Sequence, residues 1–171
     1  TRAPPPISPA YQGINSTSKT VTWTAVASQG YELQASVNST FTPLFFSSTT
    51  NSATTSLPVT GLAANTTYFV RVGAFNHGSN KNYSQLNSTS TLATFPTSPR
   101  IPAGLIWVTS ATVQWTNVAG RGYRVDAATS ASFFPIISSS ETTNAASTNL
   151  RVLNLDSGTT YFFRVGTLNW N

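Results

Sequence analysis

The stretch GLAANTTYFVRVGAFN, residues 61–76, returns as NLDSGTTYFFRVGTLN at residues 154–169. Both copies keep a leucine that is followed six residues later by a tyrosine, and then an alternation of apolar and polar residues. Alternation with a period of two indicates a β-strand that buries one face. The residues before the tyrosine differ, as is common in loops. The stretch therefore predicts one strand-forming unit that occurs twice.

The match between the two halves extends over nearly the whole chain. KTVTWTAV at residues 19–26 corresponds to ATVQWTNV at 111–118. Trp23 and Trp115 are 92 residues apart, whereas the two tyrosines of the opening stretch are 93 apart. A period of this size indicates a tandem array of small domains. We expect a first domain over residues 1–95, with a proline-rich lead-in, and a second over residues 96–171.

Each half contains several short alternating runs, and clusters of Ser, Thr, Asn, Gly and Pro separate them. No window shows a sustained helical period with capping residues. Short alternating strands with regular turn signals favour a sandwich of two antiparallel sheets. The predicted fold class is all-β, with two tandem immunoglobulin-like β-sandwiches of about seven strands each.

The landmarks of each half resemble those of fibronectin type III domains of the microbial extracellular type. They are a tryptophan on an early strand, a tyrosine that opens the next strand, and the spaced leucine and tyrosine. In that family the leucine and tyrosine form the tyrosine corner, in which the phenol hydroxyl bonds backbone a few residues upstream. The resemblance implies a structural role for Trp23, Leu62, Tyr68, Trp115, Leu155 and Tyr161.

The two halves end differently. After residue 76 the first half continues through NYSQLNSTSTLAT, residues 82–94, its expected last strand, and the second half has no counterpart. We expect the second sandwich to lack its last strand within this chain, which would leave an unpaired sheet edge. Either the sequence is part of a longer array, or a strand from another chain completes the sandwich. In both cases the expected partners are neighbouring copies or repeats, joined head to tail.

The composition excludes several classes of protein. Charged residues make up 8% of the chain, while Ser and Thr number 51 of 171. The net charge of +5 comes from singly scattered Lys and Arg, so nucleic-acid binding is not expected. No apolar run approaches 18 residues, so no membrane span is expected.

The sequence offers little material for catalysis. His77 is the only histidine, there is no cysteine, and the four acidic residues are spread over both halves. A nucleophile with its base, a pair of facing carboxylates and a clustered metal site all need more than this. We therefore predict no enzymatic activity, no catalytic or metal-binding residues and no cofactor. Instead, we expect surface ion pairs across strands, Arg71 with Glu32 and Arg164 with Asp126.

Four aromatic residues have no expected core role. Phe69 and Phe162 alternate outward, and Trp107 and Trp170 lie outside the core pattern. Outward aromatics stack on sugar rings in some proteins and form contacts between adjacent domains in others. We favour the second interpretation.

Five N-x-[S/T] triplets lie in the first half and none in the second. We expect all of them at exposed positions, where covalent glycans could be attached. Uncoated polar loops are the alternative. The triplets begin at Asn15, Asn38, Asn65, Asn82 and Asn87.

Together these features favour a non-enzymatic structural module of a repetitive extracellular or cell-surface protein, which could form fibres. Its role would be spacing and self-association, with the proline-rich connectors at residues 4–9 and 96–102 stiffening the joints. The alternatives are an ancillary spacer or carbohydrate-binding module of a secreted polysaccharide-degrading enzyme, and an adhesin.

Overall fold

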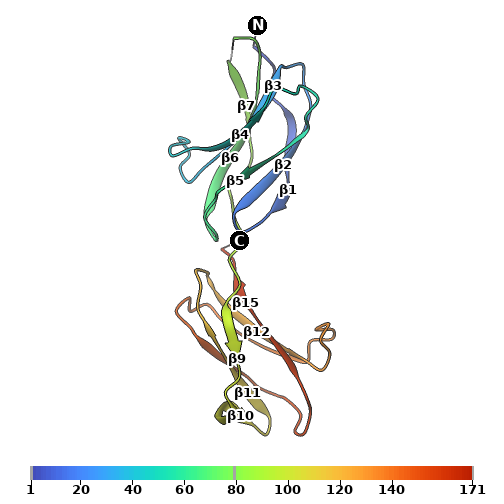
Figure 1. The fold of residues 1–171 in the computed structure, drawn as a ribbon, viewed down its shortest axis with the longest axis vertical. Helices are drawn as coiled ribbons and strands as arrows, with labels where there is room; N and C mark the ends of the chain where they lie inside the picture. The colour runs from blue at the N-terminus through green and yellow to red at the C-terminus, as the bar shows by residue number, and fades with distance from the viewer. Residues whose placement is uncertain (1, 79, 171) are drawn as a thin grey trace. The chain divides into compact units, whose positions relative to one another are not determined.

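The computed structural model describes residues 2–78 and 80–170, and their fold is all-β (Figure 1). The chain divides into two compact units, and the division falls between Leu92 and Ala93. This is three residues before the boundary expected from the sequence. The expected outer ends of the domains, Thr1 and Asn171, lie outside the described residues.

The first unit is a sandwich of two antiparallel sheets. One sheet has the strand order β1-β2-β5, and the other has the order β4-β3-β6-β7 with β8 also paired to β6. The strands are β1 (Ile7–Ile14), β2 (Ser18–Thr24), β3 (Gly30–Ser36), β4 (Phe45–Thr49), β5 (Ser56–Thr60), β6 (Thr67–Phe75), β7 (Lys81–Gln85) and β8 (Thr89–Ser90).

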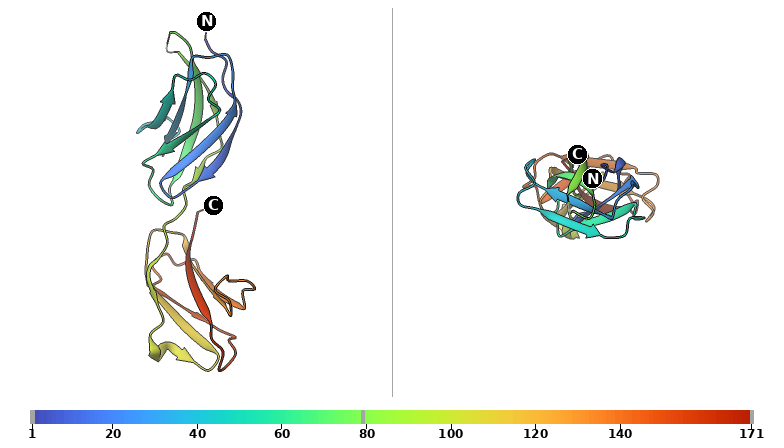
Figure 2. Two further views of the ribbon diagram at one scale, coloured as in Figure 1. Left: turned by 45° about the vertical axis from the view of Figure 1, so that its right-hand side comes forward. Right: turned by 90° about the horizontal axis from the view of Figure 1, so that it is seen from above.

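The second unit repeats this plan with fewer strands. One sheet has the order β10-β11-β14 with β9 also paired to β11, and the other has the order β13-β12-β15. Figure 2 shows the strands of this unit from a second side, in yellow to red. The elements are β9 (Thr97–Arg100), a 3-10 turn η1 (Ala103–Leu105), β10 (Ile106–Trp107), β11 (Ser110–Thr116), β12 (Gly122–Ala128), β13 (Ser138–Thr142), β14 (Asn149–Val152) and β15 (Phe162–Leu168).

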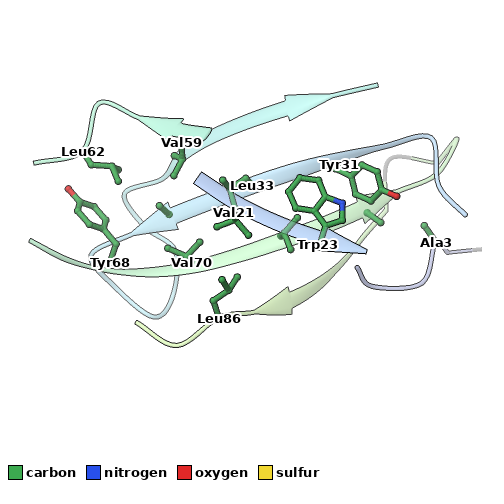
Figure 3. Close-up of a cluster of buried hydrophobic side chains, with 13 residues drawn as sticks. Ala3, Val21, Trp23, Tyr31, Leu33, Val59, Leu62, Tyr68, Val70 and Leu86 are labelled. Carbon is green, nitrogen blue, oxygen red and sulfur yellow. The ribbon is translucent and has the colours of Figure 1, made fainter. Parts of the chain in front are cut away.

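The core of the first unit lies between its two sheets. The alternating apolar residues of β2, β3 and β6 meet there, with Trp23 beside Tyr31 at one end and Leu62 with Tyr68 at the other (Figure 3). The Trp23 and Tyr31 ring centroids are 5.1 Å apart. The second unit repeats this pair, with 5.0 Å between Trp115 and Tyr123.

The register of the central strand pair is the same in both units. In the first, Tyr31 lies opposite Ala74, and in the second Tyr123 lies opposite Thr167. The next neighbour differs. β6 pairs with β7 along its other side, whereas in the described part of the chain β15 pairs with β12 alone. The described part of the second sandwich therefore has no counterpart of β7, as predicted for this chain.

Candidate functional site

The candidate functional site is the open edge, which we define as the side of β15 that faces away from β12. The first unit shows how such an edge is closed. There Gly73 lies opposite Tyr83, and Phe75 lies opposite Lys81. The Leu86 amide then donates to the Val70 carbonyl at 2.9 Å. The last strand thus contributes both a hydrogen-bonded ladder and a buried leucine.

An aromatic ring covers Gly73 in the first unit. A Cβ on Gly73 would lie 2.6 Å from the Tyr83 ring, so only glycine fits beneath it. The same ring lies 4.0 Å from the Arg71 guanidinium carbon, and Phe41 lies 3.8 Å from it. Tyr83 and Phe41 therefore both stack on Arg71 by cation–π attraction.

A polar network continues from this stack along the outer face of the sheet. Arg71 Nε donates to Gln34 Oε1 at 2.7 Å, and Gln34 Nε2 donates to the Tyr83 hydroxyl at 3.0 Å. Glu32 accepts from Lys81 Nζ at 2.7 Å. The expected pair of Arg71 with Glu32 is therefore wrong, because the register places Gln34 opposite Arg71 and Gly73 opposite Glu32.

The second unit has counterparts of Gly73, Arg71 and Phe41. Gly166 occupies the position of Gly73, and no atom would lie within 4 Å of a Cβ built on it. Arg164 lies 4.5 Å from the Phe133 ring, and no second ring covers it among the described residues.

Two arginines share one carboxylate at this edge. Arg164 and Arg124 contact Asp126 at 2.9 Å and 2.7 Å, and the first pair is the one that the sequence predicts. Burial alone would raise the pKa of Asp126, but the hydrogen bonds and charges of both arginines outweigh it and lower this pKa below its ordinary value. Asp126 therefore stays ionised at neutral pH.

Two hollows lie in the second unit where the first unit has β7 and the segment that follows it: one along β15, and one that reaches β15 only at Phe163. The first, the edge groove, measures about 370 Å³ and is lined by Phe95, Arg124, Asp126 and residues 164–168. Phe95 is 84% exposed, whereas its counterpart Ala3 is buried and accepts a hydrogen bond from Asn82 of β7. The groove thus corresponds to the space that β7 occupies in the first unit.

The second hollow, the edge cavity, measures about 440 Å³ and is mainly apolar. Its lining includes Ile101, Trp107, Ala111, Leu155, Tyr161 and Phe163. In the first unit the equivalent space receives the segment after β7, since the Leu92 amide donates to the Asn15 carbonyl and Lys19 Nζ donates to Thr89.

The residues expected at the tyrosine corners differ in burial. The Tyr68 hydroxyl accepts from the Ala63 amide at 2.9 Å, and the side chain is buried. The Tyr161 hydroxyl accepts from the Asp156 amide at 3.0 Å, but Tyr161 is only half-buried because it borders the edge cavity. The leucines and tryptophans expected in the cores are buried: Trp23, Leu62, Trp115 and Leu155.

The glycosylation candidates are not all exposed, in contrast to the expectation. Asn15, Asn38 and Asn87 are exposed. Asn65 is half-buried with a positive φ of 47°, and Asn82 is half-buried with its amide bonded to Ala3. Both lie where the chain packs back on itself, a contact that local sequence does not reveal.

The four aromatic candidates do not form one row. Phe69 is half-buried in the first unit, while Phe162 on β15 is exposed. Trp107 lies in the opposite sheet from Phe162, with the Arg151 guanidinium 4.2 Å from its ring. Trp170 is exposed beyond β15. The structure therefore does not bring them together as a sugar-stacking platform.

Two features of the site escaped the sequence reasoning. Lys19 is fully buried, and burial lowers its pKa from 10.5 to about 8. Its alternation with Val21 and Trp23 on one strand face was the available signal. The rings over the arginines come from the loops FTP and FFP, at residues 41–43 and 133–135, in which Phe41 and Phe133 both have a positive φ. Their repetition was the available signal.

The described residues contain no group of three or more His, Asp or Glu side chains that could hold a metal ion. His77 is exposed and one of its ring nitrogens lies 2.7 Å from the Gln29 amide. The part of the chain that the structure describes also has no helix of the length and apolarity that a membrane crossing needs.

The fold and the open edge define a tandem β-sandwich module. A sequence model of the Fibronectin type III domain matches residues 4–90, which is just over half of the chain. The chain therefore belongs to the fibronectin type III family. Domains of this family are typically extracellular structural or adhesion modules, and they are generally non-catalytic.

Solved structures are similar in fold. The two-domain fibronectin type III segment of chicken tenascin is 20% identical, with 96% of this chain and 91% of that chain covered at a TM-score of 0.58. The FN1–FN3 domains of chicken CNTN1 are 18% identical, with 98% and 63% covered and a TM-score of 0.44. The FN5 domain of Drosophila Lar is 24% identical, with 53% and 97% covered and a TM-score of 0.45. No curated protein matches the chain.

Proposed function

We propose that this chain is a spacing and self-association module of a repetitive extracellular protein, and that its units join end to end. The observation that carries the proposal is the repetition of one sandwich plan in two compact units that follow each other in the chain. In the described part of the chain β15 is unpaired along its outer side, and such an edge favours the addition of a further strand.

Other observations support a non-enzymatic role at a surface. The best-developed side-chain cluster, around Asp126, consists of ion pairs in which both arginines are already bonded to the carboxylate. Such a cluster orders a sheet face and offers no free base. The exposed aromatics lie on different sheets, so they do not favour carbohydrate binding over spacing. The proposal includes a microbial origin, because the repeated units resemble fibronectin type III domains of the microbial extracellular type.

Glycosylation of the first unit is part of the proposal. Exposure favours attachment at Asn15, Asn38 and Asn87, and disfavours it at Asn65 and Asn82. After expression in a glycosylating host, mass spectrometry of peptides should find glycans at the three exposed sites. Full glycan occupancy of Asn65 in a folded chain would contradict the prediction that exposed asparagines are preferred.

Sedimentation velocity tests self-association. The weight-average mass of the purified chain should rise above 18.2 kDa as its concentration increases. The Leu86 amide donates to the Val70 carbonyl, so the backbone groups of Val70 face the last strand. Phe163 is the counterpart of Val70, and since the direction of backbone groups alternates along a strand, those of Phe163 and Val165 both face the open edge. Val165→Pro removes one of these donors and should keep the chain monomeric. A single 18.2 kDa species for the unmodified chain at every concentration would sink the proposal.

A further inference from the structure

We propose that residues 87–92, which we call the exit segment, form a releasable strap over the buried ammonium group of Lys19, and that release of this strap lengthens the joint between the two units. The inference rests on the proposed spacing role and adds a way in which the spacing can change. It is argued from the surroundings of Lys19, from the bonds that hold the exit segment and from the position at which the second unit begins.

Lys19 carries its side chain into the core of the first unit. It alternates with Val21 on β2 and is fully buried. Its Nζ lies 5.3 Å from the centre of the Tyr11 ring and 5.9 Å from that of the Tyr68 ring, so both rings attract the cation. In the second unit Ala111 occupies the equivalent position. The fold therefore does not require a lysine there, and the buried charge is a feature of the first unit.

No carboxylate neutralises this charge. Glu32 is the only acidic residue among residues 1–92, and it bonds Lys81 on the outer face of the other sheet. The titratable groups that face Lys19 are the two phenols of β1 and β6, whereas the exit segment and the paired strand β5 contain none. Burial without a counter-ion lowers the pKa of Lys19 to about 8. At pH 7 the lysine is thus charged in a site that disfavours its charge.

The exit segment supplies the polar cover of the ammonium group. Lys19 Nζ donates to the Thr89 carbonyl. The Tyr11 hydroxyl donates to the Asn87 carbonyl at 2.8 Å, so the segment also holds one of the two rings in place. When the segment leaves, water replaces the carbonyl at the ammonium group. Because water solvates an ammonium ion better than a core does, the charge of Lys19 favours release.

The bonds that oppose release are few and lie within the segment itself. β8 pairs with β6 over two residues. Thr91 and Leu92 follow, with bonds to the carbonyls of Ala63 and Asn15 at 2.6 Å and 3.1 Å. The only apolar side chain of the segment is that of Leu92, which is 42% exposed. A segment without buried apolar side chains can detach while the core stays closed.

The exit segment ends directly before the second unit. Leu92 is bonded to the first unit, and the next amide, that of Ala93, donates to Asn169 Oδ1 of the second unit at 2.7 Å. No residue between these two bonded positions is free. Release of the six residues 87–92 would therefore add up to about 20 Å of extended chain to the joint.

Amide hydrogen exchange of the whole chain tests the proposal. The protection factors of Thr91 and Leu92 should rise about tenfold from pH 7 to pH 9, because Lys19 has a pKa of about 8 under the strap and near 10.5 when released. The released state thus binds more protons, and raising the pH favours the closed state. Tyr11 stays neutral over this range, since burial raises its pKa to about 12. Equal protection factors at both pH values would overturn the proposal.

Urea distinguishes release of the segment from unfolding of the first unit. Local release exposes little surface, so the protection of Thr91 and Leu92 should be lower than that of Leu33 in the central strand β3 and should change little in dilute urea. The protection of Leu33 should fall as urea is added. If all three amides share one protection factor and one urea dependence, the segment opens only with the whole unit and the proposal is rejected.

Two matched lysine variants identify the charge that acts on the strap. Lys19→Met should abolish the change of protection with pH at Thr91 and Leu92, whereas Lys81→Met removes a lysine of the surface and should leave this change in place. Each variant is compared with itself at two pH values, so a general change in stability does not decide the result. A pH dependence that persists in Lys19→Met, or that disappears in Lys81→Met, would contradict the assignment to Lys19.

The results separate this inference from the proposed function. Local, pH-dependent release in a chain that stays monomeric would retain the inference and reject self-association. Self-association without local release would do the reverse.

Discussion

At the scale of single residues, equivalent side chains of the two units differ in burial because their surroundings differ. Tyr68 and Tyr161 make the same bond to a backbone amide, with 2.9 Å and 3.0 Å between donor and acceptor. Only Tyr68 is buried from water. The bond of Tyr68 is partly buried and that of Tyr161 is exposed, so the groups freed by loss of the hydroxyl are rehydrated less readily at Tyr68.

The two tyrosines should therefore respond differently to loss of the hydroxyl. Tyr68→Phe should lower the free energy of unfolding of the first unit by about 1–3 kcal/mol, and Tyr161→Phe should lower that of the second by about 1 kcal/mol or less. Chemical denaturation of both variants beside the unmodified chain measures these values. Equal losses of unfolding free energy would show that burial does not determine the cost of removing the hydroxyl.

Buried Lys19 predicts an unusual pH dependence. Its pKa is about 8 in the folded first unit and near 10.5 when unfolded, so between these values the unfolded chain binds more protons. The free energy of unfolding should then rise with pH, by about 1–3 kcal/mol. Above pH 10 Tyr11 opposes this, because burial raises its pKa to about 12. Thermal melts from pH 7.5 to 10 should show the rise, and Lys19→Met should remove it. A flat profile in the unmodified chain would contradict the assignment.

At the scale of elements, β6 and β15 share sequence and register but not their outer neighbour. A tyrosine ring lies above Gly73 of β6, and nothing lies within 4 Å above Gly166 of β15. Neither glycine has a positive φ, so in these strands the space above the residue decides whether a side chain is tolerated.

An alanine exchange at these two glycines should have opposite outcomes. Gly73→Ala forces a methyl group against the Tyr83 ring and should destabilise the first unit by about 1–3 kcal/mol. Gly166→Ala meets no atom and should be neutral or stabilising by up to about 1 kcal/mol, since glycine weakens a strand interior. Urea unfolding of the two variants compares them directly. Equal effects would mean that β7 does not cover Gly73 in this way.

At the scale of the whole molecule, the chain contains two cores that share no buried residue. Val70 and Val72 are fully buried in the first, whereas Phe163 and Val165 are half-buried in the second. The first core therefore removes its residues from water more completely, which favours higher stability.

Calorimetry should resolve two unfolding transitions, with the lower one belonging to the second unit. Val125→Ala should move only the lower transition, and Val72→Ala only the upper one. Each change should lower the free energy of unfolding of its own unit by about 2 kcal/mol, because two buried carbon groups are removed. A single transition that moves with both variants would indicate that the cores unfold together.

The sequence by itself determined the two-unit plan, the strand alternation and the paired tryptophan and tyrosine of each core. These are local or repeated patterns, which period and spacing reveal. Only the tertiary structure decided which partner Arg71 takes, that Asn65 and Asn82 are half-buried, and that Lys19 is enclosed by the segment after β7. Each of these depends on register and on loops distant in sequence, because strand pairing brings together residues that no local pattern relates.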